Sequence, residues 1–188
     1  MRCLLLFVVL ALTLNACATL SEKPIEVYQL GLMQHLQKQA NWYFSGRLAL
    51  VDEKNSISAS INWRHRVNED NIELYGPLAQ GRVAITIVGD KITVDDGEQQ
   101  QAYLGRVDSV LTALLGVDIP AQALRFWVLG VTDPEQAYTE ISDGFIQNGW
   151  MVRYKELQNL NSETLPRKIS SEKEKTKVRL VIDQWELS

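Results

Sequence analysis

The chain has 188 residues and carries 19 Lys and Arg against 23 Asp and Glu, which gives a formal net charge of −4. This balance argues against a nucleic-acid partner, because neutralising phosphates requires a basic surface. The length suits one domain with a sizeable hydrophobic core.

The first segment is typical of a bacterial lipoprotein signal. Arg2 precedes an apolar stretch from Leu4 to Leu14, which is too short to span a bilayer since that takes roughly 20 residues. Ala16 and Cys17 then place a cysteine directly after a small residue, as acylation of the thiol before cleavage requires. An ordinary secretory signal with a cysteine near its end is the alternative.

The segment implies a lipid-anchored protein that faces the periplasm. We expect residues 1–16 to be the signal peptide, Cys17 to carry the lipid, and residues 17–24 to form the lipidated N-terminus and tether. Ala18 follows Cys17 where an acidic residue would be typical of retention in the inner membrane. Residence in the outer membrane is therefore favoured, and acyl chains hold a protein durably to a bilayer.

Residues 25–188 are expected to form a single domain that begins with a helix. From Ile25 to about Ala40, apolar residues recur at helical spacing beside Gln, His and Lys, at Ile25, Tyr28, Leu32, Leu36 and Ala40. One amphipathic helix is the simplest interpretation of this pattern.

The hydrophobic period then changes to two, which predicts half-buried antiparallel strands. Gly89-Asp90 and Asp95-Asp96-Gly97 supply turns between neighbouring strands. The expected strands contain Leu48 to Leu50, Ile57 to Trp63, Val83 to Ile87, Ile92 to Val94, Tyr138 to Ser142, Gly144 to Gln147, Trp150 to Lys155, Leu165 to Ser171 and Val178 to Leu187. The basic stretch from Arg167 to Arg179 is interleaved with glutamates and is typical of a solvated hairpin end.

Two helices are predicted between these strands. Val107 to Leu115 shows helical spacing with Gly116 just past its end, and Pro120 opens a second helix that stops at Gly130. The pattern predicts an α+β fold of roughly ten strands and three helices. So large a sheet must curl, and the helices either cover a hydrophobic cavity on its concave face or fill that face as a core.

Several short motifs resemble the outer-membrane lipoprotein receptor family LolB in order and spacing, from the lipoprotein signal to the last residues. The motifs are Trp42-Tyr43-Phe44-Ser45-Gly46-Arg47-Leu48-Ala49-Leu50, Ile61-Asn62-Trp63, Tyr75-Gly76-Pro77-Leu78, Ile119-Pro120, Phe126-Trp127-Val128-Leu129-Gly130, Asn148-Gly149-Trp150, Leu165-Pro166 and Asp183-Gln184-Trp185.

The resemblance implies a strongly curved antiparallel sheet, an incomplete barrel of the LolA/LolB type, with a helical lid over a hydrophobic cavity. It further implies a monomeric receptor that accepts acylated lipoproteins from the periplasmic carrier LolA and inserts them into the outer membrane, without a cofactor or nucleotide. In the family a loop projects an exposed leucine for lipid delivery. Leu78, in Gly76-Pro77-Leu78, matches that position, although Ala79 stands where relatives often have glycine.

Other site residues are expected from the apolar faces of the predicted elements. The candidate residues for an acyl-chain cavity are Leu48, Ile61, Trp63, Leu74, Ile85, Trp127 and Trp150. The same side chains would also serve a filled core. Arg47, a charge on an otherwise apolar strand, is a candidate latch that pairs with a carboxylate on the lid.

Two other functions stay open. A structural or scaffold lipoprotein of the envelope would use the same anchor but bind a protein partner and have a packed interior. A lipid-modifying hydrolase is the weaker alternative, because the chain has only two histidines, His35 and His65, and lacks the usual hydrolase and metal-binding motifs. We expect no metal site and no enzymatic activity.

Overall fold

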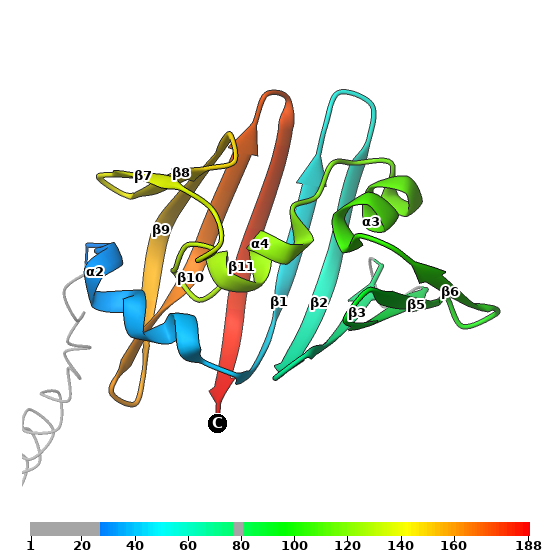
Figure 1. The fold of residues 1–188 in the computed structure, drawn as a ribbon, viewed down its shortest axis with the longest axis horizontal. Coiled ribbons are helices and arrows are strands. Elements are labelled where there is room, and N and C mark those ends of the chain that lie inside the picture. The colour runs from blue at the N-terminus through cyan, green and yellow to red at the C-terminus, as the bar shows by residue number, and fades with distance from the viewer. Residues whose placement is uncertain (1–26, 77–80) are drawn as a thin grey trace, which may run out of the picture.

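The computed structural model describes residues 27–76 and 81–188, which form a curved sheet with helices on one side (Figure 1). Cys17 and residues 77–80 lie outside the described residues. The strands are β1 (Asn41–Val51), β2 (Ser56–Arg66), β3 (Glu69–Tyr75), β4 (Arg82–Val88), β5 (Lys91–Asp95), β6 (Gln100–Leu104), β7 (Tyr138–Ile141), β8 (Gly144–Gln147), β9 (Trp150–Leu160), β10 (Glu163–Lys173) and β11 (Thr176–Leu187).

These eleven strands form one antiparallel sheet in the order β6-β5-β4-β3-β2-β1-β11-β10-β9-β8-β7. All neighbours are also consecutive in sequence except the central pair, in which the first strand joins the last. In the described part of the chain β6 and β7 are edge strands, so the sheet curves without closing. The predicted incomplete antiparallel barrel is confirmed.

Alternation along β1 sets which side chains face the core. Trp42, Phe44, Leu48 and Leu50 are buried, whereas Arg47 is exposed. A bulge in β11 opposite Ser45 and Gly46 shifts its alternation by one residue. Because of this shift, both Ile182 and Trp185 point inward although they are three residues apart.

Two of the predicted helices are present and lie across the inner face of the sheet (Figure 1). Helix α3 spans Val107–Leu115 and ends at Gly116 in the left-handed conformation. Helix α4 spans Ala121–Trp127, and a tight turn then brings the chain to Gly130. Gly130 has a φ of +86°, and a Cβ atom there would collide with the sulfur of Met33.

The single long helix predicted from Ile25 to Ala40 is wrong. The described part contains only α2 (Leu30–Met33) and the 3₁₀ helix η1 (Gln34–Lys38). The buried residues Leu30, Met33 and Leu36 are three apart, which matches the three-residue turn of a 3₁₀ helix better than the α-helical period. Leu32, which the helical pattern placed inside, is 69% exposed.

Strands β3 and β6 have no counterpart among the predicted strands, because their alternation is weak. Strand β3 buries Asp70 on the same face as Ile72, and β6 is a polar edge strand that is largely exposed.

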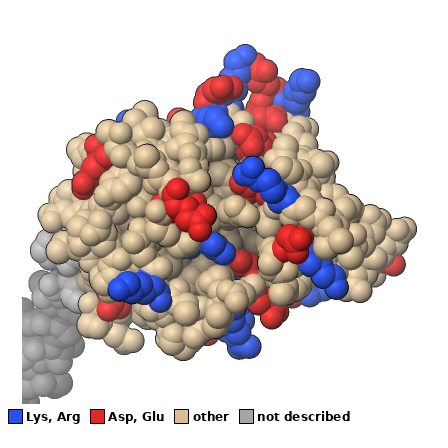
Figure 2. All heavy atoms as spheres, viewed as in Figure 1, with Lys and Arg blue, Asp and Glu red and all other residues tan. Residues whose placement is uncertain are grey.

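Charged side chains of both signs gather over the β1–β2 and β10–β11 hairpins at the top of Figure 2. One ion pair, between Lys175 and Glu53, joins these hairpins. The predicted solvated hairpin end is confirmed.

Among the described residues, no helix has the length and apolar character needed to cross a membrane.

Candidate functional site

A cavity lies between the inner face of the sheet and helices α3 and α4, and its walls are entirely apolar. The sheet contributes Leu48, Leu50, Ile61, Trp63, Ile72, Leu74, Ile85 and Leu180, and the helical segment contributes Leu111, Leu115, Ile119, Ala121 and Leu124. Its volume is about 50 Å³, whereas pockets that hold small molecules usually measure about 300–1,000 Å³. The space can hold a few methylene groups in this conformation, but not an acyl chain.

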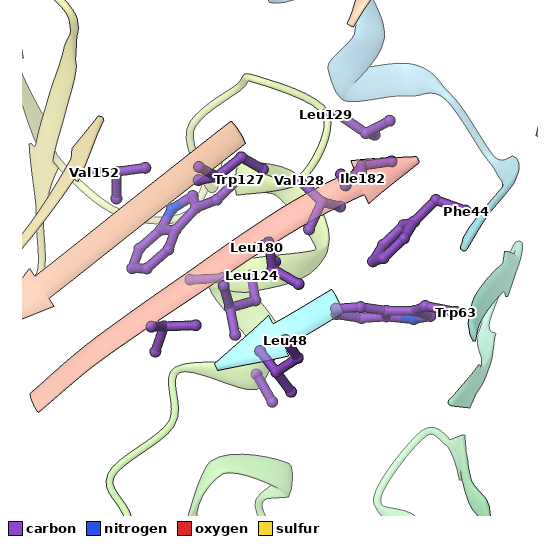
Figure 3. Close-up of a cluster of buried hydrophobic side chains, with 14 of the residues drawn as sticks. Phe44, Leu48, Trp63, Leu124, Trp127, Val128, Leu129, Val152, Leu180 and Ile182 are labelled. Atoms are coloured by element: carbon purple, nitrogen blue, oxygen red, sulfur yellow. The ribbon is translucent and has the colours of Figure 1, made fainter. Parts of the chain in front are cut away.

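The structure brings five of the seven predicted cavity residues together in this wall: Leu48, Ile61, Trp63, Leu74 and Ile85. The helical residues Leu111, Leu115 and Leu124 were not among the predicted lining residues. Figure 3 shows Leu124 of α4 close to Leu48 of β1. The cavity wall therefore consists of one helical side and one sheet side.

Trp127 and Trp150 do not line this cavity. Trp127 lies further along α4 on the side of Val152 (Figure 3), and its ring packs 6.2 Å from that of Trp150 and 6.3 Å from that of Phe145. All three side chains are at most 2% exposed. The alternative of a filled core thus applies to the part of the concave face beneath the end of α4.

The end of α4 is tied to the sheet by a buried amide. The Gln147 side chain accepts hydrogen bonds from Trp127 Nε1 and the Asp133 backbone N–H, both at 2.9 Å. It donates to the backbone carbonyls of Asp133 and Gln136, also at 2.9 Å. Gln147 is 1% exposed, and its four bonds satisfy its full capacity of two donors and two acceptor sites.

Two tyrosines hold the same turn. The Tyr154 hydroxyl donates to the Trp127 carbonyl at 2.8 Å, the Tyr28 hydroxyl donates to the Gly130 carbonyl at 2.9 Å, and the two rings stack with centroids 4.2 Å apart. Burial raises the pKa of both hydroxyls well above the ordinary tyrosine value. Both therefore remain neutral hydrogen-bond donors.

The cavity end of the helical segment has fewer polar ties to the sheet. Asn55 Nδ2 donates to the Gly116 carbonyl at 3.2 Å, and Lys173 lies 3.8 Å from Asp118. Both contacts are at the surface and exchange readily with water. Movement of α3 away from the sheet would break these contacts and expose apolar side chains, while the Gln147 and tyrosine contacts stay intact.

Arg47 is placed on the other face of the sheet from the helices. Its guanidinium pairs with Asp183 Oδ1 of β11 at 3.1 Å, with the two side chains 65% and 46% exposed. This geometry contradicts the predicted latch to the lid, because Leu48 faces the cavity and strand alternation turns Arg47 outward.

The Gly76 N–H contacts the Gly81 carbonyl at 3.3 Å. Leu78 and Pro77 lie outside the described residues, as does Cys17.

A buried polar cluster that sequence reasoning did not identify lies beside the cavity. Asp70 Oδ1 accepts a hydrogen bond from Trp63 Nε1 at 2.8 Å, and it lies 2.8 Å from His65 Nδ1. The sequence shows this cluster only as a charge inside a strand with weak alternation. No group of three or more metal-ligating side chains occurs in the described ranges.

The chain matches the family described as "Outer membrane lipoprotein LolB" over residues 40–185. It is 32% identical over 159 residues to the outer-membrane lipoprotein LolB of Nitrosococcus oceani, covering 81% of this chain and 79% of that one. Identity to the LolB of an Azoarcus species is 27% over 181 residues, covering 93% and 90%.

Two solved structures share the fold. A LolA superfamily protein from Nitrosomonas europaea superposes with a TM-score of 0.52 at 12% identity, covering 87% of this chain and 94% of that chain. A DUF1329 family protein from Desulfovibrio piger gives a TM-score of 0.55 at 7% identity, covering 83% and 89%. At these identities the likeness concerns the fold alone.

Proposed function

The chain belongs to the LolB family of outer-membrane lipoproteins, which act in lipoprotein localisation, and we propose that it accepts acylated lipoproteins from the carrier LolA and inserts them into the outer membrane. The observation that carries this proposal is the cavity between α3, α4 and the curved sheet, whose thirteen lining residues are all apolar. Such a surface suits hydrocarbon and offers no group for acid, base or nucleophilic chemistry.

The energetics favour an acyl chain as the ligand. Each buried methylene is worth about 0.8 kcal/mol, so a sixteen-carbon chain gains about 12 kcal/mol before ordering costs. Displacing α3 breaks mainly the Asn55 to Gly116 hydrogen bond and the Lys173 to Asp118 contact, and the acyl chain replaces the apolar contacts that the helix gives up. We infer that cargo enters as the helical segment moves away from the sheet.

Delivery then follows from differences in affinity, since the proposed step uses no nucleotide. The cavity must bind acyl chains more tightly than the carrier does, and the bilayer must bind them more tightly still. We propose that the lipid on Cys17 keeps the domain at the membrane and that Leu78 contacts the bilayer during release. Each of these two roles depends on the family resemblance of its motif.

A transfer experiment tests the proposal. LolA loaded with a lipoprotein is mixed with vesicles that carry the full-length acylated chain, and lipoprotein in the vesicle fraction is measured over time. Transfer that depends on the chain is expected. Failure of cargo to leave the carrier, or transfer in the reverse direction, would contradict the proposed order of affinities.

A matched pair of variants assigns the uptake to the cavity. Leu115 lines the cavity, whereas Leu114 on the same helix is 41% exposed. Leu115→Gln is expected to reduce transfer and the binding of a fluorescent fatty-acid probe, and Leu114→Gln to change neither. Absence of saturable probe binding by the unsubstituted chain would favour a scaffold lipoprotein, and release of a cleaved lipid product would favour a hydrolase.

A further inference from the structure

Arg125, on α4, lies close to the cavity and has an incompletely paired guanidinium. Its side chain is half-buried, and its Nε is buried without a hydrogen-bond partner. Within the described residues its guanidinium takes part in no ion pair or hydrogen bond, and it contacts the Phe126 ring, 4.9 Å from the ring centroid. A guanidinium has five N–H donors, and leaving a buried charged donor unpaired is costly.

Arg125 separates two hollows at one end of the half-barrel. The larger hollow, of about 370 Å³, lies between α4, the start of α3 and the ends of β2, β3 and β4. The smaller one, of about 250 Å³, lies between α4, η1 and the β2–β3 turn. Asn68 and Arg125 border both hollows, so together they form a cleft around the guanidinium.

The other polar groups of the cleft leave the guanidinium available. Asp70 borders the larger hollow, but its Oδ1 already interacts with Trp63 and His65. His65 uses Nδ1 for that contact, and its Nε2 has no hydrogen-bond partner in the described part of the chain. Lys38 borders the smaller hollow beside His65. The cleft therefore combines the cationic side chains of Arg125 and Lys38 with a single carboxylate, whose Oδ1 is already engaged.

The cleft adjoins the apolar cavity. Trp63 and Ala121 line both the larger hollow and the cavity. A ligand whose polar end contacts Arg125 would therefore direct an attached acyl chain toward Leu124 and the sheet. Carboxylates and phosphates are the groups that a guanidinium binds most strongly, through two parallel hydrogen bonds.

We propose that the cleft around Arg125 binds the oxyanion headgroup, a phosphate or a carboxylate, of an acyl-chain ligand whose tail enters the apolar cavity. The inference rests on the proposed function, because it requires that the cavity accept an acyl chain. It adds a second determinant of affinity, the charge of the headgroup, to the hydrophobic one.

Probes that differ only in the headgroup test this proposal. The full-length acylated chain is held in phosphatidylcholine nanodiscs and crosslinked to photoactivatable palmitoyl-glycerol 3-phosphate, palmitate or neutral monopalmitoyl-glycerol. The half-saturating concentration is measured for the unsubstituted chain, for Arg125→Gln and for Arg125→Lys. Arg106→Gln is the matched control, because Arg106 is exposed next to α3 and carries the same charge. Partition of a probe into the disc is common to all variants and cancels between them.

The expected result is a roughly tenfold weaker binding of the phosphate and carboxylate probes by Arg125→Gln, which corresponds to about 1.4 kcal/mol. Arg125→Lys should show a smaller loss, and the neutral probe should bind all variants equally. Equal weakening of all three probes, or of none, would overturn the headgroup site while leaving acyl uptake intact. If no probe binds the unsubstituted chain, the proposed function itself fails. Competition by inorganic phosphate alone at similar concentrations would show a free-anion site and refute the acyl-ligand assignment.

Discussion

Replacement of Gln147 by leucine should be among the most destabilising conservative changes in this domain. The variant keeps a side chain of similar size but removes two donated and two accepted hydrogen bonds, each of 2.9 Å. The partners that lose a bond are Trp127 Nε1, the Asp133 N–H and the carbonyls of Asp133 and Gln136. Trp127 is fully buried, so water cannot replace its partner.

The magnitude follows from these four contacts. A hydrogen bond contributes about 0.5–1.5 kcal/mol net, and a buried group left unpaired costs about 1–3 kcal/mol. The backbone groups of Asp133 and Gln136 are nearer the surface and can recover some hydration. We therefore expect Gln147→Leu to lower the free energy of unfolding by about 3–5 kcal/mol, a large share of the 5–15 kcal/mol typical of a domain.

Urea denaturation of residues 18–188, monitored by tryptophan fluorescence, measures this decrease in the free energy of unfolding. The midpoint should fall while the slope of the transition stays unchanged. Gln122→Leu is the control, because Gln122 is exposed on α4, the helix that carries Trp127, and its side chain makes no hydrogen bond within the described residues. A loss below about 1 kcal/mol for Gln147→Leu would refute the reasoning, because it would mean that the buried donors find other partners at little cost.

Three further predictions concern single residues. Leu78→Glu should leave uptake from LolA intact but lower incorporation of cargo into vesicles, and unchanged incorporation would remove Leu78 from the release step. Arg47→Ala should change stability by less than about 1 kcal/mol, as for other exposed ion pairs, and should not alter probe uptake; a change in uptake would revive a role in the lid. Ser171→Ala should raise the free energy of unfolding by about 1 kcal/mol, because the buried Ser171 hydroxyl has no partner. Ser170→Ala should not raise it, because the Ser170 hydroxyl bonds Glu172 at 3.2 Å. The denaturation midpoints of the two variants test this difference.

Local patterns predicted the elements that are stabilised locally. The alternation from Ile57 to Trp63 identified β2, and helical spacing with a following glycine identified α3 to the residue. The outward position of Arg47 could also have been predicted from the alternation within β1, because its neighbour Leu48 faces inward. In a strand without a bulge, the face of a side chain follows from its position in the alternation, which the sequence contains.

Only the tertiary structure decided which of these elements meet. The pairing of β1 with β11 joins residues more than a hundred positions apart, and the shortened helix before β1 follows from packing at Leu30, Met33 and Leu36 rather than from its own periodicity. The split of the apolar residues into a cavity around Leu48 and a solid core around Trp127 depends on where α4 lies against the sheet. An apolar stripe records that a face is buried, but not how much space remains beneath it, because that volume depends on two surfaces brought together by the fold.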